Sequence, residues 1–311
     1  MATNREILDN MLSTIENIAT RKSAKNAIWQ FLKWVDGFYN GDLPDLEVAS
    51  LWHKEIGVGA STWYSYWGWV QKYYRYIESP TLYKVKPVRN RAFLKDPLTE
   101  EQSRKVLALA EQKALSGEYG NIRDNCIIQL LFFTGMRVGE IVKMDIDDIR
   151  VVPYPNQKFA FEIRAQLKGR QTKDHIMIVT NGAYHTFKGY LQLRKGKPDE
   201  AVFIEVYRFK YGLGGKRLTV ETVSRMVKSY FKEAGIDSKR ITAHSIRHTF
   251  ATNILRNGAP LGVVQRSLGH SSVKTTERYS HMIPELKGEN FVNYEPKGAK
   301  HGTVAIDSDS V

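Results

Sequence analysis

Two arginines, two histidines and one tyrosine lie in short motifs between positions 134 and 280 of this 311-residue chain. They are Arg137 in Thr-Gly-Met-Arg-Val-Gly-Glu, His244 and Arg247 in His-Ser-Ile-Arg-His, His270 after Leu-Gly, and Tyr279 in Thr-Glu-Arg-Tyr-Ser. Lys168 is available between the first two motifs. The set combines permanent cations, titratable bases and a phenol, so it could perform chemistry on a phosphate.

Attack of a phenol oxygen on a phosphodiester would use all of these residue types. Negative charge builds on the two non-bridging oxygens, and preorganised cations stabilise that charge. Arginine suits this role because its guanidinium stays charged and its planar fork binds two phosphate oxygens at once. A tyrosine, with a pKa of roughly 10, needs a base such as histidine, and the departing 5′ oxygen needs a proton that a lysine of lowered pKa can donate. This scheme requires no metal and no nucleotide cofactor.

In their order and spacing, these motifs resemble those of the tyrosine recombinase, or phage-type integrase, family from about Leu98 to about Pro284. The resemblance implies a site-specific DNA recombinase that cuts and rejoins strands through a covalent 3′-phosphotyrosine and exchanges them through a Holliday junction. It implies Tyr279 as the nucleophile. The other implied catalytic residues are Arg137, Lys168, His244, Arg247 and His270. The implied partner is double-stranded DNA, bound by two protomers at a site and by a homotetramer at synapsis, with no cofactor.

Two further residues are expected to support this site. Glu140 lies three residues after Arg137, so on a helix its carboxylate would orient the guanidinium. His244, Arg247 and His248 are spaced three and four apart, so they would share one helix face. A His-x-x-x-His pair can also bind zinc, but this segment offers no third ligand and no carboxylate base, so we expect no metal. His248 is then expected to support the site.

The proton donor is expected on a β-hairpin. Apolar residues that alternate between Phe159 and Val179 predict two strands, joined by the polar turn Lys168-Gly-Arg-Gln-Thr-Lys173. The family keeps its general acid at such a hairpin tip, and this turn is longer than usual. Lys168, at the end of the first strand, is the preferred candidate, and Lys173 is the alternative general acid.

The amino-terminal part reads as a set of short helices rich in aromatic residues. Segments 24–39 and 62–77 have apolar patterning of helix length. In the second, Trp67, Val70 and Tyr74 are spaced three and four apart, so they would face a small helical core. The density of aromatic residues exceeds what one buried face needs, which leaves a DNA-facing role open for the others.

Basic residues near the end of this part are candidate DNA contacts. Segment 79–97 contains prolines and basic residues without a helical period, so it predicts an inter-domain linker that could lie along a DNA backbone. The candidate DNA-binding residues are Lys72, Arg75, Lys84, Lys86, Arg89 and Arg91.

These patterns predict a mainly α fold with a small β-hairpin sheet in the catalytic domain, arranged as a two-domain DNA clamp. Thr99 and Gln102 have the spacing of a capping box, which predicts the first catalytic helix. The expected regions are a helical core-binding (SAM-like) DNA-binding domain at 1–78, a basic linker at 79–97, the catalytic domain at 98–286, and a tail at 287–311 that the resemblance suggests is exchanged between protomers.

The overall composition agrees with a nucleic-acid partner. The chain carries 46 Lys+Arg against 33 Asp+Glu, a formal net charge of +13, and strongly basic chains favour polyanions. The single cysteine, Cys126, lies in an apolar run, so it is expected in the core and fits a reducing cytoplasm. No stretch approaches the roughly 18 apolar residues of a membrane span, so we expect a cytoplasmic protein.

Other functions match parts of the pattern. A type IB topoisomerase would use the same chemistry to rejoin the original strand, but the Leu-Gly-His270 turn and the compact length favour recombination. A non-catalytic DNA-binding relative is disfavoured because Arg137, Arg247 and Tyr279 are all present. The lack of an amino-terminal arm-binding domain favours a Xer-like enzyme. The glycine-rich segment 212–217 lacks the spacing of a phosphate loop and is expected to be a flexible basic loop.

Overall fold

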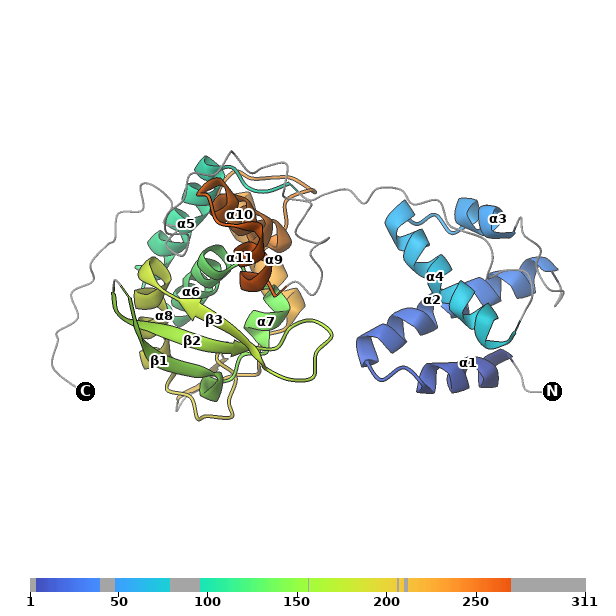
Figure 1. Cartoon of the computed structure of the whole chain (residues 1–311), viewed down its shortest axis with the longest axis horizontal. Coiled ribbons are helices and arrows are strands. Elements are labelled where there is room, and N and C mark those ends of the chain that lie inside the picture. Colours follow the sequence, from blue (N-terminus) through green and yellow to red (C-terminus); the bar gives the residue numbers. More distant parts are fainter. Residues whose placement is uncertain are drawn as a thin grey trace. The chain divides into compact units, whose positions relative to one another are not determined.

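The computed structural model describes residues 4–39, 48–78, 96–155, 157–205, 207–209 and 212–269. The chain divides into two compact units, residues 1–94 and 95–311, whose elements are labelled in Figure 1. Most of the predicted linker and the whole of the predicted tail lie outside the described residues. The positions of the domain boundaries therefore stay predictions.

The amino-terminal unit contains helices α1 (Asn4–Ser13), α2 (Ile18–Tyr39), α3 (Val48–Glu55) and α4 (Ala60–Tyr76). Both helices predicted here are confirmed, and α2 begins earlier than its apolar pattern, at Ile18 rather than Ala24. Aromatic rings join three of the helices, because Phe31 of α2 lies 4.9 Å from Trp52 and 5.9 Å from Trp67, measured between ring centroids. Such edge-on aromatic contacts lie within a core that also buries aliphatic residues.

The aromatic residues of α4 divide between the core and the surface. The predicted core residues are confirmed: Trp67 and Val70 are 0% exposed and Tyr74 is 3% exposed. Tyr64 and Tyr76, in contrast, are 37% and 47% exposed. Packing therefore accounts for one face of α4, and the expectation that the opposite face contacts DNA stays a prediction.

The second unit is mainly helical. Its first helix, α5, begins with the predicted capping box, in which the Thr99 hydroxyl accepts from the Gln102 N–H at 3.1 Å and the Thr99 N–H donates to the Gln102 side chain at 3.0 Å. The helices are α5 (Glu100–Ala114), α6 (Tyr119–Thr134), α7 (Val138–Val142), α8 (Asn181–Arg194), α9 (Val220–Glu233), α10 (Ala243–Arg256) and α11 (Leu261–Ser267), with a short 3₁₀ helix, η2 (Ile146–Asp148). No helix of the described residues is long and apolar enough to cross a membrane.

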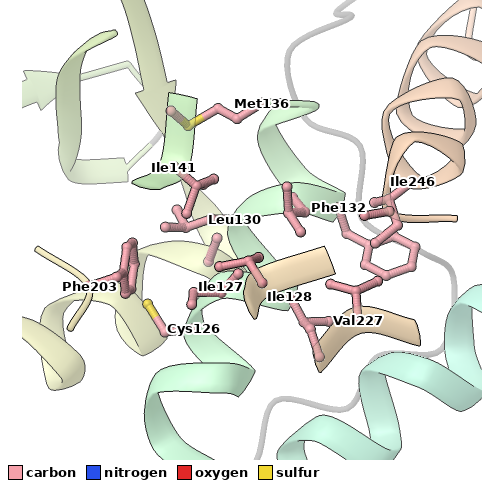
Figure 2. Close-up of a cluster of buried hydrophobic side chains, with 14 of the residues drawn as sticks. Cys126, Ile127, Ile128, Leu130, Phe132, Met136, Ile141, Phe203, Val227 and Ile246 are labelled. Carbon is pink, nitrogen blue, oxygen red and sulfur yellow. The ribbon is translucent and has the colours of Figure 1, made fainter. Parts of the chain in front are cut away.

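Helix α6 forms the centre of this unit. Its residues from Asn125 to Phe132 are all buried, as is typical of a helix surrounded by others, and it packs against α5, α8, α10 and β3. Figure 2 shows its side chains meeting residues of α7, α9 and α10 in one apolar cluster. The predicted core position of Cys126 is confirmed, and burial raises the pKa of its thiol, which makes the thiol chemically inert.

A small antiparallel sheet lies beside the helices in the order β1 (Ile149–Tyr154), β2 (Gln157–Ala165), β3 (His175–Val179) (Figure 1). The predicted hairpin is confirmed as β2 and β3, and its buried residues Phe161 and Ile163 pair with Val179 and Met177. Strand β1 was not predicted.

The glycine-rich segment 212–217 contains a short strand and an isolated bridge. It begins with strand β5 (Gly212–Gly214), which pairs with β4 (Tyr207–Phe209), and Arg217 forms an isolated bridge with Ile204. Part of this segment is therefore paired with neighbouring residues, and the expectation that it is a flexible basic loop stays a prediction. The fold class is confirmed: the described residues are mostly helical with small antiparallel sheets.

Candidate active site

The first arginine lies just after a tight turn at the end of α6. Gly135 has φ 65°, a left-handed conformation that suits glycine, and its N–H donates to the Leu131 carbonyl at 3.1 Å. A Cβ at this position would lie 2.3 Å from the Phe250 ring, so the turn also depends on a close approach of α10. Arg137 follows the turn as the residue that precedes α7.

Glu140 holds Arg137 with both carboxylate oxygens. Its Oε1 accepts from the Arg137 guanidinium at 2.7 Å, and its Oε2 accepts from the Arg137 backbone N–H at 2.8 Å. The carboxylate is only 3% exposed, whereas the Arg137 side chain is 26% exposed. The geometry expected between these two residues is therefore present, with the anion buried and the cation reaching the surface.

Arg247 joins the second motif to the same carboxylate. Its Nη1 lies 3.8 Å from Glu140 Oε2 and donates to the Gly135 carbonyl at 2.8 Å. A second guanidinium nitrogen donates to the carbonyl of Leu268, the residue that directly follows α11. We call this set the arginine junction: Arg137, Glu140 and Arg247, with the carbonyls of Gly135 and Leu268. It connects α6, α7, α10 and α11 within one buried cluster.

Helix α10 presents its titratable residues to two environments. It begins after Thr242, where the Thr242 N–H donates to the Ser245 hydroxyl at 3.1 Å. His244, in the first turn, is exposed, whereas Arg247 and His248 are 3% and 8% exposed. The His248 Nδ1 lies 3.3 Å from the Thr252 hydroxyl, a contact that orients its ring inside the helix packing.

Lys168 lies in the turn between β2 and β3. Strand β2 ends at Ala165, so Lys168 stands beyond the strand and not at its end, where the sequence pattern placed it. The side chain is exposed, but its neighbour Leu167 is buried and meets Gly269, where a Cβ would lie 2.7 Å from the Leu167 methyl groups. Gly269 has φ 59° and ends α11 with a left-handed stop.

Lys173, the alternative acid, is occupied by carboxylates. Its Nζ lies 2.6 Å from Asp145 Oδ2 and also bonds Asp148 Oδ2. Burial lowers the pKa of Lys173, but the hydrogen bonds and charges of the two aspartates outweigh this effect and raise it above its ordinary value. Among the described residues, no carboxylate forms an ion pair with Lys168. Its raised pKa makes Lys173 a weaker acid than an ordinary lysine, and the assignment of the general acid stays a prediction.

Several predicted site residues fall outside the described residues. They are His270, Tyr279, Lys84, Lys86, Arg89 and Arg91. Of the remaining candidate DNA contacts, Lys72 and Arg75 are exposed on α4, and the Lys72 Nζ lies 4.1 Å from the centroid of the Trp69 ring. Their role in binding DNA stays a prediction.

Some contacts of the site were not anticipated from the sequence. The carbonyls of Gly135 and Leu268 that accept from Arg247, and the aspartates that bind Lys173, belong to this group. For the aspartates a signal existed in the sequence. Three carboxylates in Asp145-Ile-Asp-Asp148 follow shortly after α7, and such a cluster requires cations nearby.

Comparison with known sequences decides the family. The sequence profile of the phage integrase family matches residues 97–285. The chain belongs to the phage integrase family. This confirms the resemblance to tyrosine recombinases, and the match includes all the motifs that carry it.

Curated relatives in this family are tyrosine recombinases. XerD of Oceanobacillus iheyensis is 29% identical over 224 residues, which cover 70% of this chain and 68% of that protein. XerD of Staphylococcus epidermidis is 30% identical over 197 residues, which cover 62% of this chain and 61% of the relative. XerC of Chlamydia caviae is 31% identical, with 65% and 60% covered. The chain thus spans about two thirds or less of the length of these relatives.

Solved structures show the same fold. XerH recombinase in a post-cleavage complex with a palindromic difH substrate has a TM-score of 0.69 at 21% identity, covering 85% of this chain and 77% of that one. A λ integrase fragment, a dimer bound to a COC′ core site, has a TM-score of 0.60 at 15% identity, covering 88% and 97%. At these identities the likeness shows the fold of tyrosine recombinases.

Proposed function

We propose that this protein is a site-specific recombinase that cuts double-stranded DNA by attack of Tyr279, forms a covalent 3′-phosphotyrosine and passes the strand to a partner duplex through a Holliday junction. The observation that carries the proposal is the arginine junction. One buried carboxylate, that of Glu140, holds Arg137 at 2.7 Å and lies 3.8 Å from Arg247, so two motifs far apart in the sequence meet at one point.

The arginines would bind the phosphate that is attacked. Each guanidinium has N–H groups on both edges of its plane, so hydrogen bonds to Glu140 or to carbonyls on one edge fix the direction of the other. A cation fixed in this way needs no reorganisation when charge builds on the non-bridging oxygens, which is the source of its catalytic effect. Arg137, with a quarter of its side chain exposed, is open to a ligand.

The remaining residues would move protons. The Tyr279 hydroxyl gives its proton to a histidine as its oxygen bonds to phosphorus, and His244 and His270 are the candidates. The bond from phosphorus to the 5′ oxygen breaks, and Lys168 protonates that leaving oxygen. The preference for Lys168 is supported by the aspartates that hold Lys173. Ligation reverses the steps without an outside energy source.

The amino-terminal unit would grip the duplex through the exposed face of α4, where Lys72 and Arg75 lie. By analogy with the family, two protomers bind one site and four form the synapse, with the tail after residue 287 exchanged between them. A basic protein of this kind acts on DNA in the cytoplasm.

A nicked suicide substrate tests the proposal. Cleavage next to the nick releases a short fragment, so ligation cannot follow and the covalent complex accumulates. We expect a protein–DNA band that survives denaturant, together with exchanged products when two intact sites are present. Relaxation of supercoiled DNA without exchanged products would indicate the topoisomerase alternative, and binding without any adduct would indicate a non-catalytic relative.

A further inference from the structure

Three carboxylates lie close together shortly after helix α7. Asp145, Asp147 and Asp148 place one oxygen each within 4.8 Å of one another, and the Asp148 side chain is only 4% exposed. Like charges at such distances destabilise a fold unless cations compensate them. The compensating cations here come from two other segments, so the cluster joins parts of the chain that are distant in sequence.

Lys173 supplies one of these cations from the β2–β3 turn. It contacts Asp145 at 2.6 Å and bonds Asp148 through the same ammonium group. The Asp148 oxygen that it contacts also accepts from the Asp145 N–H at 2.8 Å, which closes the first turn of η2. Figure 1 shows the loop that joins β2 and β3, and through Lys173 this loop contacts the residues at the start and end of η2.

Arg217 continues the connection to α7. It pairs with Asp145, and one guanidinium nitrogen donates to the carbonyls of Val142 and Met144 at 2.9 and 3.2 Å. Val142 is the last residue of α7, and Arg137 immediately precedes the first. A chain of hydrogen-bonded groups therefore runs from Lys173 to a five-residue helix that begins at a proposed phosphate-binding arginine.

The β2–β3 turn is thus attached at two points on either side of Lys168. On the side of β2, Leu167 packs against Gly269, next to His270 in the chain. On the side of β3, Lys173 is held by the aspartates. A turn of this length would otherwise lose many conformations when it orders, so both attachments restrict where Lys168 can reach.

We propose that Lys173 is a positioning residue, which holds the β2–β3 turn against η2 and α7 and so sets the distance between Lys168 and the phosphate bound at the arginine junction. This inference rests on the proposed function. It assigns Lys173 a task that depends on its charge and its geometry but not on transfer of its proton.

A DNA substrate with sulfur at the leaving position shows whether Lys173 places the proton donor or only supports the fold. When sulfur replaces the 5′ leaving oxygen, departure needs no proton, so only variants defective in protonation are rescued. We expect Lys173→Met to cleave normal DNA about tenfold to a hundredfold more slowly, because a misplacement of about 1 Å costs up to a hundredfold, and to recover most of this rate on the sulfur substrate. Normal cleavage by Lys173→Met, or a defect that sulfur does not rescue, would overturn the inference.

Arginine substitutions separate the positioning residue from the acid. Lys173→Arg keeps a cation for both aspartates but cannot readily give up a proton, so it should cleave normal DNA within a few-fold of the wild type. Lys168→Arg should be slow and rescued by sulfur. If Lys173→Arg were as slow as Lys168→Arg on normal DNA, and also rescued, Lys173 would be the acid and the inference would be wrong.

The aspartates provide a second test that does not depend on Lys173→Met folding well. Asp148→Asn should give a defect that sulfur rescues, and its combination with Lys173→Met should be less harmful than the product of the two single effects, since both remove one contact. Asp174→Asn, which breaks an exposed ion pair with Arg170 in the same turn, is the matched control and should cleave normally. Independent effects of Lys173 and Asp148 would contradict the inference.

Adduct formation by the wild type shows whether the proposed function or only the role of Lys173 has failed. If it forms no covalent adduct on any substrate, the proposed function fails, and the role of Lys173 falls with it. If the wild type forms the adduct and the Lys173 and Asp148 variants match it, the inference alone fails.

Discussion

The arginine junction and the β2–β3 turn present their cations in opposite ways. In the arginine junction, Glu140 and Arg247 are each 3% exposed, and Arg247 donates to two backbone carbonyls of residues that directly follow α6 and α11. In the turn, Lys168 is exposed, and the nearby Lys173 keeps 27% of its side chain exposed. The first region is fixed by buried hydrogen bonds, whereas the second is held by the two ion pairs of Lys173 and by the contact of Leu167 with Gly269.

The difference follows from what each cation would do in the reaction. An arginine that only stabilises charge gains from being rigid, since preorganisation reduces the cost of charge build-up. A lysine that protonates the leaving 5′ oxygen takes the proton back from the incoming 5′ hydroxyl on ligation. It must therefore reach the strand ends, while other contacts restrict its position. The two regions thus combine a rigid anion site with a proton donor on an exposed turn.

The largest expected effect is on cleavage by the arginine variants. Arg137→Lys and Arg247→Lys each keep the charge and lose the fork, which should slow cleavage by about a hundredfold or more. Only Arg247→Lys should also lower the free energy of unfolding, by about 1–3 kcal/mol, because buried carbonyls lose their donor. Single-turnover rates and thermal unfolding measure the two effects.

The exposed Arg240, paired with Asp96 at 2.8 Å, offers a matched control as Arg240→Lys, which should change neither quantity. Equal stability of the Arg137 and Arg247 variants would remove the distinction between a buried and an exposed arginine.

The next effect concerns the turn that supports the junction. Gly135→Ala should destabilise the protein by about 1–2 kcal/mol for the left-handed backbone and by about 1–3 kcal/mol more for the clash with Phe250. Gly117 has a similar positive φ, 72°, but a Cβ there would meet no atom within 4 Å, so Gly117→Ala should show the backbone cost alone. Denaturant unfolding measures the free energy of unfolding of both variants. Equal losses of stability would show that α10 shifts easily to make room for the Cβ.

The pH dependence of stability tests the ion pairs that hold the β2–β3 turn. Burial raises the pKa of Asp145, but hydrogen bonds to Lys173 and Arg217 outweigh it and hold the pKa below its ordinary value. Its contribution is therefore complete above the unfolded pKa of about 3.9 and is lost as the pH falls through the folded value. The stability difference between wild type and Asp145→Asn should be constant near neutral pH and shrink below about pH 4. A difference that persisted at lower pH would mean that Asp145 is not held as an anion by these cations.

The smallest expected effect is on DNA binding by the amino-terminal unit. If exposed Lys72 contacts a phosphate, Lys72→Ala should weaken DNA binding for all sequences and reduce the slope of log affinity against log salt by about 1. Lys105, an exposed lysine paired with Glu101 at 2.7 Å in the second unit, provides the control as Lys105→Ala. An unchanged slope for Lys72→Ala would place the DNA elsewhere on α4.

Local patterns predicted much of this architecture. The capping box at Thr99 and the pairing of Arg137 with Glu140 each depend on residues within a few positions, and the structure contains both. Strand β1 escaped prediction because Pro153 disfavours a strand interior; it is tolerated because β1 is an edge strand of the sheet.

The contacts that complete the site depend on tertiary packing. No pattern in the sequence specifies which carbonyls accept from Arg247, because every residue offers a carbonyl and only the packing of α10 on α6 and α11 selects Gly135 and Leu268. The same reason explains why the choice between Lys168 and Lys173 stayed open in the sequence. The partners of Lys173 lie 25 and 28 positions away.

Attack by Tyr279 on the phosphate held at the arginine junction is tested most directly by mass-spectrometric mapping of the trapped adduct. Wild-type protein would be trapped on the nicked substrate, digested, and searched for the peptide that carries a nucleotide, with Tyr279→Phe treated in parallel. We expect the nucleotide on Tyr279, and we expect Tyr279→Phe to bind DNA nearly normally but to form no adduct. A nucleotide on another residue, such as Tyr294, or an adduct that persists in Tyr279→Phe, would contradict this mechanism.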